Sequence, residues 1–152
     1  MKRTIWVING PNLNLLGSRE PDLYGNTSLE ELNQDLRSLA RNLEIDIEFY
    51  QSNHEGEIID RIHAARGRAD FLILNAGALT HYSIALYDAL KAVRVPVIEV
   101  HLTNPYAREE FRHRSFVAPA AVGGIFGLGV LGYRLAVEAA CSLLREDREA
   151  DA

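Results

Sequence analysis

Apolar residues recur along the chain with two alternating spacings, one typical of strands and the other typical of helices. Short apolar or alternating runs predict strands over Thr4–Asn9, Ile45–Tyr50, Phe71–Asn75, Val97–His101 and Ala121–Phe126. Apolar positions three and four residues apart predict helices over Ser28–Leu43, Glu55–Arg66, Ser83–Val93 and Gly132–Glu146, with a helical turn over Glu109–Arg112. Thr27 and Glu30 fit a capping box at the start of the first helix.

Strands that alternate with helices indicate an α/β fold, in which helices cover both faces of a parallel sheet. Five strands within 152 residues favour the flavodoxin-like, doubly wound arrangement with strand order 2-1-3-4-5. No internal repeat or linker divides the chain. We therefore expect a single domain over residues 1–152, of which residues 147–152 form a disordered tail.

Polar side chains are concentrated in the loops that follow the first, third and fourth predicted strands. The first loop, Gly10–Asn26, has no apolar periodicity, and a long structureless loop in a compact domain is usually functional. Ligands of open α/β sheets bind beyond the carboxyl ends of the strands where strand order reverses, which here is between the first and third strands. The polar residues expected at that edge are Asn9, Asn12, Asn14, Arg19, Tyr24, Asn75, Thr80, His81, Tyr82, His101, Thr103, Asn104, Arg108, Arg112 and His113. Arginines pair with carboxylates and amides both donate and accept, so these residues predict a pocket for a small anion rich in hydroxyl groups.

Glu99 and His101 are two residues apart on a predicted strand, so their side chains share one face. The strand is otherwise apolar, and a buried carboxylate needs a partner. We expect Glu99 to hold one imidazole nitrogen of His101, which would fix the tautomer and make the other nitrogen more basic.

Composition and charge exclude several other classes of protein. The net charge of −5 argues against nucleic acid or an anionic membrane as a partner. No apolar stretch approaches the roughly 20 residues that span a bilayer, and the N-terminal apolar run is too short for a signal peptide. The only cysteine, Cys141, cannot form an internal disulfide, so we expect a cytoplasmic protein.

Three further signals are weak. Gly127–Gly132 matches the G-x-G-x-x-G dinucleotide fingerprint, but no later strand completes the unit, and close packing of a helix against a strand also explains the glycines. The five histidines lack the spacing of a metal site. Lys2 and Lys91, the only lysines, do not lie at strand ends, which leaves no candidate for Schiff-base chemistry.

Several motifs, in order from about residue 4 to residue 145, resemble those of type II 3-dehydroquinate dehydratases. They are Asn9–Gly17, Arg19–Pro21, Tyr24–Gly25, Gln51–Asn53, Glu55–Gly56, Asn75–Ala78, Thr80–His81, Glu99–Leu102, Arg108–Glu109 and Phe111–His113. The resemblance implies reversible anti dehydration of 3-dehydroquinate to 3-dehydroshikimate through an enolate, without a metal or cofactor. Both the shikimate pathway and quinate breakdown use this reaction.

The resemblance also implies roles for individual residues. Tyr24 would remove a proton from C2, and because free tyrosine is a poor base at neutral pH, Arg19 and Arg108 would favour its phenolate form. Asn12 would hold the water that stabilises the enolate. His101, oriented by Glu99, would protonate the departing C1 hydroxyl.

The substrate would be bound by a second set of residues. The backbone amides of Leu102 and Thr103 would hold its carboxylate, and the residues that bind its hydroxyls would be Asn75, His81 and Arg112. Asp88 would reach in from a neighbouring subunit of a homo-oligomer, the dodecamer (a tetramer of trimers) of the family. Loop Gly17–Gly25 would close over the substrate. Tyr82, Thr103, Pro119 and Phe126 depart from the family pattern, and the bulky Tyr82 beside His81 is expected to alter the fit of the pocket.

Two other functions fit the residues alone. The pocket suits a non-catalytic binding domain for a small polyol carboxylate, and the glycine-rich motif suits a nucleotide-binding protein.

Overall fold

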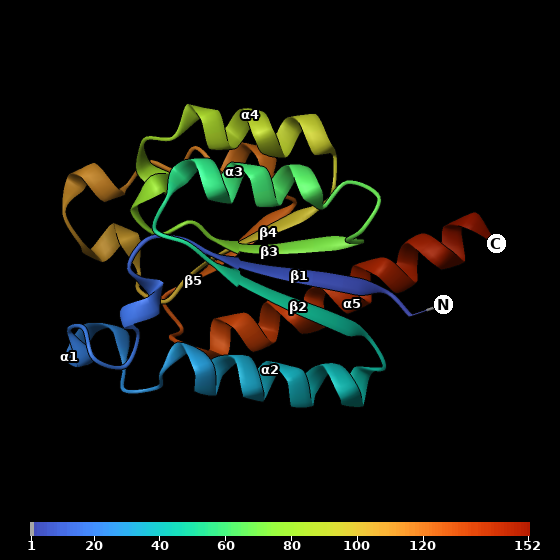
Figure 1. Cartoon of the computed structure of the whole chain (residues 1–152), viewed down its shortest axis with the longest axis horizontal. Helices are drawn as coiled ribbons and strands as arrows, with labels where there is room; N and C mark the ends of the chain where they lie inside the picture. Colours follow the sequence, from blue (N-terminus) through green and yellow to red (C-terminus); the bar gives the residue numbers. More distant parts are fainter. Residues whose placement is uncertain (1) are drawn as a thin grey trace.

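The five strands form one parallel sheet in the order β2-β1-β3-β4-β5, which confirms the predicted doubly wound α/β fold (Figure 1). In this computed structural model, which describes residues 2–152, the strands are β1 (Thr4–Asn9), β2 (Asp46–Gln51), β3 (Phe71–Asn75), β4 (Val97–His101) and β5 (Gly123–Phe126). Both β2 and β5 begin later than their apolar patterns predict. The order places β1 beside β3, so the loops after these two strands diverge from neighbouring positions.

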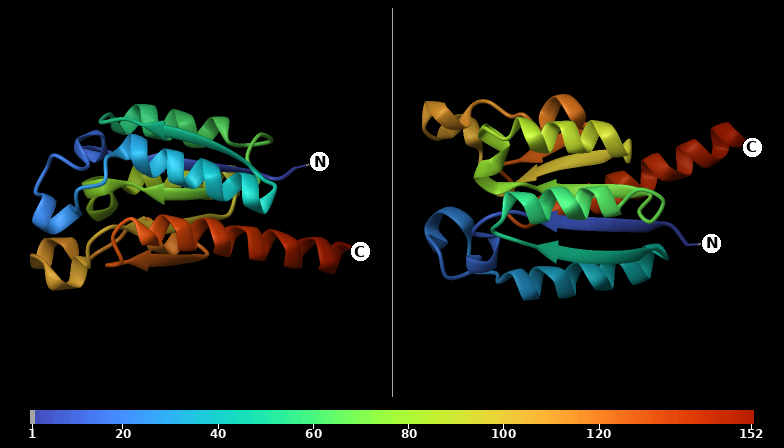
Figure 2. Two further views of the ribbon diagram at one scale, coloured as in Figure 1. Left: turned by 90° about the horizontal axis from the view of Figure 1, so that it is seen from below. Right: turned by 45° about the horizontal axis from the view of Figure 1, so that its top comes forward.

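Helices cover both faces of the sheet (Figures 1 and 2). One face carries α2 (Leu29–Leu43) and α5 (Leu131–Asp151), and the other carries α3 (Glu55–Ala64) and α4 (Ile84–Val93). α5 continues through residues 147–151, for which the sequence predicts a disordered tail, and its last turns project past the sheet. Within residues 2–152, no helix has both the length and the apolar character needed to cross a membrane.

The core has two apolar layers, one on each side of the sheet. Successive side chains of a strand point to opposite faces. Ile5 and Val7 of β1 therefore join the layer under α2 and α5, whereas Trp6 and Ile8 join the layer under α3 and α4. Burial on both faces explains why β1, β3 and β4 are almost continuously apolar in sequence.

The predicted helix cap is wrong by one residue. Ser28, not Thr27, is the N-cap of α2: its hydroxyl accepts from the Glu31 backbone N–H at 3.1 Å and donates to the Glu31 carboxylate at 3.2 Å. The helix accordingly starts at Leu29, and the pair is Ser28 with Glu31 rather than Thr27 with Glu30.

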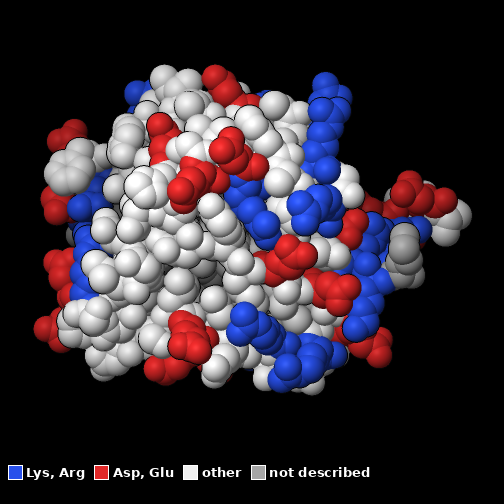
Figure 3. Space-filling model, in the orientation of Figure 1, with Lys and Arg blue, Asp and Glu red and all other residues white. Residues whose placement is uncertain are grey.

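Surface charge is mixed on the face shown in Figure 3, where basic side chains lie next to acidic ones. On this face no broad area is basic alone. A continuous basic surface is the usual footprint of a nucleic-acid-binding protein.

A buried hydrogen-bond network joins the sheet to α5. The Tyr133 hydroxyl donates to Asn9 Oδ1 at 2.6 Å and accepts from Asn75 Nδ2 at 2.8 Å. The three side chains are almost fully buried, and burial raises the pKa of Tyr133, so its hydroxyl keeps its proton. Buried amides need such partners, and α5 supplies one for the last residues of both β1 and β3.

We predict that Tyr133→Phe lowers the free energy of unfolding by about 2 kcal/mol or more, because it leaves a buried acceptor on Asn9 and a donor on Asn75 unsatisfied. Urea denaturation followed by circular dichroism would measure the loss. Tyr50→Phe is the control, since Tyr50 is half-buried on β2 and loses the same hydroxyl away from this network. Equal stability of the two variants would contradict the prediction.

Candidate active site

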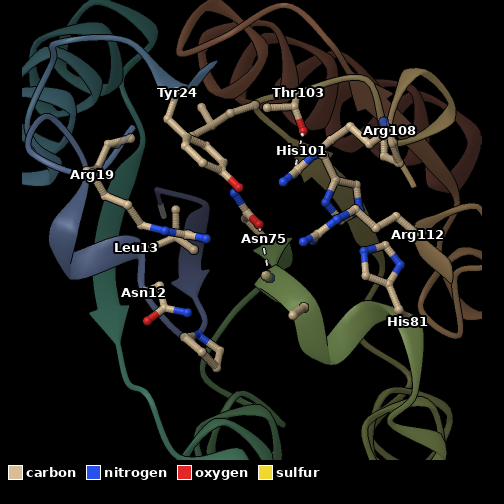
Figure 4. Close-up of a pocket in the computed structure, with 16 residues that line it drawn as sticks. Asn12, Leu13, Arg19, Tyr24, Asn75, His81, His101, Thr103, Arg108 and Arg112 are labelled. Atoms are coloured by element: carbon tan, nitrogen blue, oxygen red, sulfur yellow. Dashed lines mark hydrogen bonds between the residues drawn. The ribbon is translucent and has the colours of Figure 1, made fainter. Parts of the chain in front are cut away.

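A cavity of about 290 Å³ lies beyond the carboxyl ends of β1, β3 and β4, at the predicted edge of the sheet (Figure 4). Its walls come from the three loops that the sequence indicates. The lining residues are Pro11, Asn12, Leu13, Leu16, Arg19, Tyr24, Asn75, Gly77, Ala78, His81, His101, Leu102, Thr103, Pro105, Arg108 and Arg112. All predicted site residues except Glu99 and Asp88 are in this set.

Other predicted residues lie outside the cavity. Glu99 is buried behind His101, and Asp88 is exposed on α4. Tyr82 was expected to alter the fit of the pocket, but it does not line the cavity and is 64% exposed. The remaining polar loop residues that do not line it are Asn9, Asn14, Thr80, Asn104 and His113.

The long loop after β1 contains two short helical segments that its sequence pattern does not reveal. They are η1 (Leu13–Leu15) and α1 (Pro21–Tyr24), each too short to show a helical period. Leu13 and Leu16 are buried and anchor the first part of the loop against the core. The loop thus holds Asn12 and Tyr24 on one wall of the cavity (Figure 4).

Two glycines allow the loops after β1 and β3 to interlock. A Cβ atom on Gly10 would lie 2.4 Å from the Ala76 carbonyl oxygen, and one on Gly77 would lie 2.9 Å from the Pro11 carbonyl oxygen. Gly77 also has a φ of 59°, in the left-handed region that favours glycine. Asn12 is held beside them, because its backbone N–H donates to Asn53 Oδ1 at 2.9 Å.

The hydrogen bond predicted between Glu99 and His101 is present, with 2.6 Å between Glu99 Oε2 and His101 Nε2. Because Nε2 is engaged by the carboxylate, Nδ1 is the nitrogen left for a ligand. The same Glu99 oxygen accepts from the Ser115 hydroxyl at 2.7 Å. The sequence analysis missed Ser115, which lies 16 residues beyond Glu99 in an irregular segment and has no pattern that marks it.

His81 is held as a neutral hydrogen-bond acceptor. Its Nδ1 donates to the Arg114 carbonyl oxygen at 2.9 Å, and its ring stacks on that of His101 with 6.4 Å between centroids. Burial is the main cause that lowers the pKa of His81 from its ordinary value of 6.5; the hydrogen bond to Arg114 opposes this effect, and the nearby Arg112 guanidinium adds to it. Its Nε2 is then unprotonated at neutral pH and can accept from a ligand hydroxyl.

Two guanidinium groups lie near the ring of Tyr24. The Cζ atoms of Arg19 and Arg108 are 4.8 Å and 5.5 Å from its centroid. Figure 4 shows Tyr24 and Arg19 on the wall opposite His101 and His81.

The cavity is electropositive as a whole. Its lining includes Arg19, Arg108 and Arg112 but no carboxylate. Each arginine has an acidic neighbour at the rim: Glu20 Oε2 lies 3.6 Å from Arg19 Nε, and Glu109 Oε2 lies 3.9 Å from Arg108 Nε and 2.7 Å from Arg112 Nε. The arrangement suits a small anion that binds with its charged group inside the cavity.

The glycine-rich motif Gly127–Gly132 braces the end of β4. The backbone N–H groups of Gly127 and Gly129 donate to the carbonyl oxygens of His101 and Leu102 at 3.2 Å and 2.9 Å. A Cβ on Gly132 would lie 3.4 Å from Ile125 Cγ2. Packing of helix against strand, which the sequence analysis considered, applies to Gly132, whereas Gly127 and Gly129 have φ values of 83° and 61°, in the left-handed region that favours glycine. Within residues 2–152, no cluster of three or more His, Cys, Asp or Glu side chains is arranged to hold a metal ion.

Residues 3–141 match the family described as dehydroquinase class II. The chain is 56% identical over 140 residues to a 3-dehydroquinate dehydratase of Halothermothrix orenii, a match that covers 92% of this chain and 95% of that protein. It is 55% identical over 135 residues to catabolic 3-dehydroquinase 2 of Neosartorya fischeri, covering 89% and 90% of the two chains.

The structure is similar to solved structures of the same kind. The type II dehydroquinase of Butyrivibrio crossotus superposes with a TM-score of 0.89 at 46% identity, covering 91% of this chain and 97% of that one. A 3-dehydroquinate dehydratase-like protein of Bifidobacterium longum has a TM-score of 0.72 at 31% identity, covering 94% and 98%.

We predict that His81 titrates with a midpoint below 6.5. The unfolded chain then binds a proton at His81 more readily than the folded chain does. The contribution of neutral His81 to the free energy of unfolding is therefore present above pH 6.5, and it is lost as the pH falls through the lower pKa of the folded state. Proton NMR of the imidazole resonances would measure the midpoint. Arg112→Ala should raise it, because a neighbouring positive charge is removed. A midpoint at or above 6.5 in the unmodified chain would refute the assignment of a neutral acceptor.

Proposed function

This chain belongs to the class II dehydroquinase family, whose reaction is the dehydration of 3-dehydroquinate, and we propose that its cavity carries out that reaction through an enolate. One observation supports the proposal above the others. A single electropositive cavity places Tyr24 and Arg19 on one wall and a carboxylate-paired His101 on the opposite wall, from which the Arg108 guanidinium comes within 5.5 Å of the Tyr24 ring centroid. A substrate between them would have a base on one side and an acid on the other, as anti elimination requires.

Tyr24 is the proposed base. Its phenolate takes a proton from C2 of the substrate, and the C–H electron pair forms an enolate with the adjacent ketone. Arg19 and Arg108 favour the phenolate because they place positive charge beside the ring. Asn12, on the same wall, holds a water molecule that donates to the enolate oxygen. Stabilising charge where it develops is the kind of interaction that contributes most to catalysis.

His101 is the proposed acid. The enolate collapses to form the carbon–carbon double bond and expels the C1 hydroxyl, which takes a proton from His101 Nδ1 and leaves as water. Glu99 supports this step in two ways. It holds Nε2 at 2.6 Å, which aims Nδ1 toward the cavity, and its charge stabilises the protonated ring before the transfer. The elimination needs no further reactant.

Backbone and side chains of the other two loops bind the substrate in this proposal. The amides of Leu102 and Thr103 hold the carboxylate, and the glycine contacts to the carbonyls of His101 and Leu102 keep that backbone in place. His81 accepts from a substrate hydroxyl through Nε2. The other residues proposed to contact hydroxyls are Asn75 and Arg112.

The segment Gly17–Gly25 is proposed to close over the bound substrate. Gly17 and Gly25 have φ values of 92° and 87°, which side-chain-bearing residues rarely adopt, so the segment is bounded by two positions of unusual backbone freedom. The segment carries Arg19 and Tyr24. Closure would exclude water and strengthen the charge interactions around the enolate.

We propose that the enzyme assembles as a dodecamer, a tetramer of trimers, in which Asp88 reaches the cavity of a neighbouring subunit. Asp88 is exposed on α4 and outside the cavity of its own chain. Tyr82 and Ile84, close to it in sequence, are 64% and 57% exposed, and large exposed apolar side chains often mark an interface. The cytoplasmic location stays a prediction, which cell fractionation would test.

We predict that Tyr24→Phe and His101→Ala each reduce kcat by roughly 10²-fold or more, the usual scale for loss of a general base or acid. The product is a conjugated enone, so ultraviolet absorbance follows the reaction directly. Tyr50→Phe and His63→Ala are matched controls outside the cavity and should keep kcat near that of the unmodified chain.

Three results would separate the alternatives. No absorbance rise with the unmodified, folded chain would indicate a binding domain rather than an enzyme. Near-normal kcat in either site variant, with unchanged circular dichroism, would show that the assigned role is wrong. A thermal shift with NAD but not with 3-dehydroquinate would favour a nucleotide-binding protein.

We predict a solution mass of roughly twelve times the chain mass of 17.0 kDa. Light scattering coupled to size-exclusion chromatography would measure it. Asp88→Ala should raise KM if the carboxylate enters a neighbouring cavity, whereas Asp60→Ala on α3 should not. A monomer with full activity would contradict both the assembly and the role of Asp88.

A further inference from the structure

Residues 114–117 run behind the two histidines of the cavity, between η4 (Glu110–Arg112) and η5 (Ala118–Ala120). The Arg114 carbonyl accepts from His81 at 2.9 Å, and the Phe116 backbone N–H donates to the Thr80 carbonyl at 2.8 Å. Val117 is fully buried in the core layer under α3 and α4. The segment is therefore anchored on both sides of Ser115, the residue whose side chain reaches Glu99.

That side chain is Ser115, and its hydroxyl is oriented by two hydrogen bonds. It accepts from the Ala118 backbone N–H at 3.0 Å and donates to Glu99 Oε2 at 2.7 Å. A serine hydroxyl has a single proton, so the bond to Glu99 uses its full donor capacity. Glu99 Oε2 in turn accepts from His101 Nε2 at 2.6 Å. A continuous chain of hydrogen bonds thus leads from the backbone of η5 to the imidazole.

We propose that Ser115 is a positioning residue that acts on His101 through Glu99. This inference rests on the proposed function, in which His101 delivers the proton to the departing hydroxyl. Ser115 does not line the cavity itself; it lies beside Glu99 in an adjoining hollow that also borders His81 and His101. Its effect is to fix the position of Glu99 Oε2. That oxygen holds Nε2 of His101, and so keeps Nδ1 of the same ring directed at the reacting group.

The physical basis is the burial of the carboxylate. Glu99 is 7% exposed, and its Oε2 takes two hydrogen bonds from protein side chains, those of His101 and Ser115. With Ser115 present, Glu99 Oε2 has two donors and cannot rotate without breaking both bonds. Without it, only His101 holds the carboxylate, and the pair can turn together. His81, which stacks on the ring, and Arg112 form no hydrogen bond with His101 that could restore its orientation.

The test compares Ser115→Ala with Ser115→Thr. Loss of a hydrogen bond to a charged group should reduce kcat by about tenfold in Ser115→Ala. KM should stay within about twofold, because no substrate contact is removed. Ser115→Thr keeps the hydroxyl and should restore most of kcat, since Ser115 is only half-buried and a methyl group can be accommodated.

Ser83→Ala is the matched control. Ser83 also accepts from the backbone N–H three residues further on, that of Leu86 at 3.0 Å, but it donates to no carboxylate. Its loss should lower Tm by a few degrees and leave kcat unchanged. If Ser115→Ala and Ser83→Ala have the same small effect on kcat, Ser115 is only a structural cap and the inference is overturned.

A double-mutant cycle with Glu99→Gln gives a second test that does not depend on the threonine variant. If Ser115 acts through the carboxylate, Ser115→Ala should lower kcat much less in the Glu99→Gln background than in the unmodified chain. Equal losses in both backgrounds would mean that Ser115 acts by another route, and would overturn the proposal.

Proton NMR separates failure of this inference from failure of the proposed function. The His101 Nε2 proton, held by a short bond to a carboxylate, should give a strongly deshielded resonance that disappears in Glu99→Gln and shifts in Ser115→Ala. An inactive unmodified chain in which the resonance still responds to Ser115→Ala would refute the proposed function and support the coupling. An active chain in which neither the resonance nor kcat responds would refute the coupling alone.

Discussion

The hydroxyl of Tyr133 joins the ends of the two central strands, and the position of the cavity depends on this contact. Asn9 and Asn75 end β1 and β3 as buried amides, and Tyr133 of α5 satisfies one with its proton and the other with its oxygen. The two amides can therefore stay buried at the point where the loops after β1 and β3 leave the sheet in different directions. Just beyond them, Gly10 and Gly77 let the two loops pass within contact distance of each other's backbone. The floor of the cavity is thus a rigid product of close packing.

The two walls of the cavity carry different kinds of charged and titratable groups. On one side, Arg19 and Arg108 place positive charge beside the phenol of Tyr24. On the other, the Glu99 carboxylate holds the imidazole of His101 by a hydrogen bond of 2.6 Å. In the proposed elimination both walls are needed, because a proton leaves one carbon and a hydroxyl leaves its neighbour. Residues outside the cavity support its walls, including the glycines that brace the end of β4.

Much of the architecture could be predicted because helices and strands have different apolar periods. The strand order, the long loop after β1 and the pairing of Glu99 with His101 follow from period, loop length and spacing along one strand. Other features could not be predicted in this way. The one-turn helix α1 is too short to show a helical repeat of apolar residues. Ser28 and Thr27 are both suitable N-caps, and the backbone conformation decides which of them caps α2.

By itself, the sequence determined the fold class, the edge of the sheet where the cavity lies, and most of the side chains gathered there, because these depend on local patterns and on the geometry of parallel sheets. Tertiary structure alone decided which distant residues support them. Tyr133 meets Asn9 across 124 positions of sequence, and Ser115 reaches Glu99 from an irregular segment with no periodic signal. The same is true of the arginines around Tyr24, whose distances from its ring depend on how two separate loops fold over the cavity. Such contacts arise from packing in three dimensions, which no local pattern records.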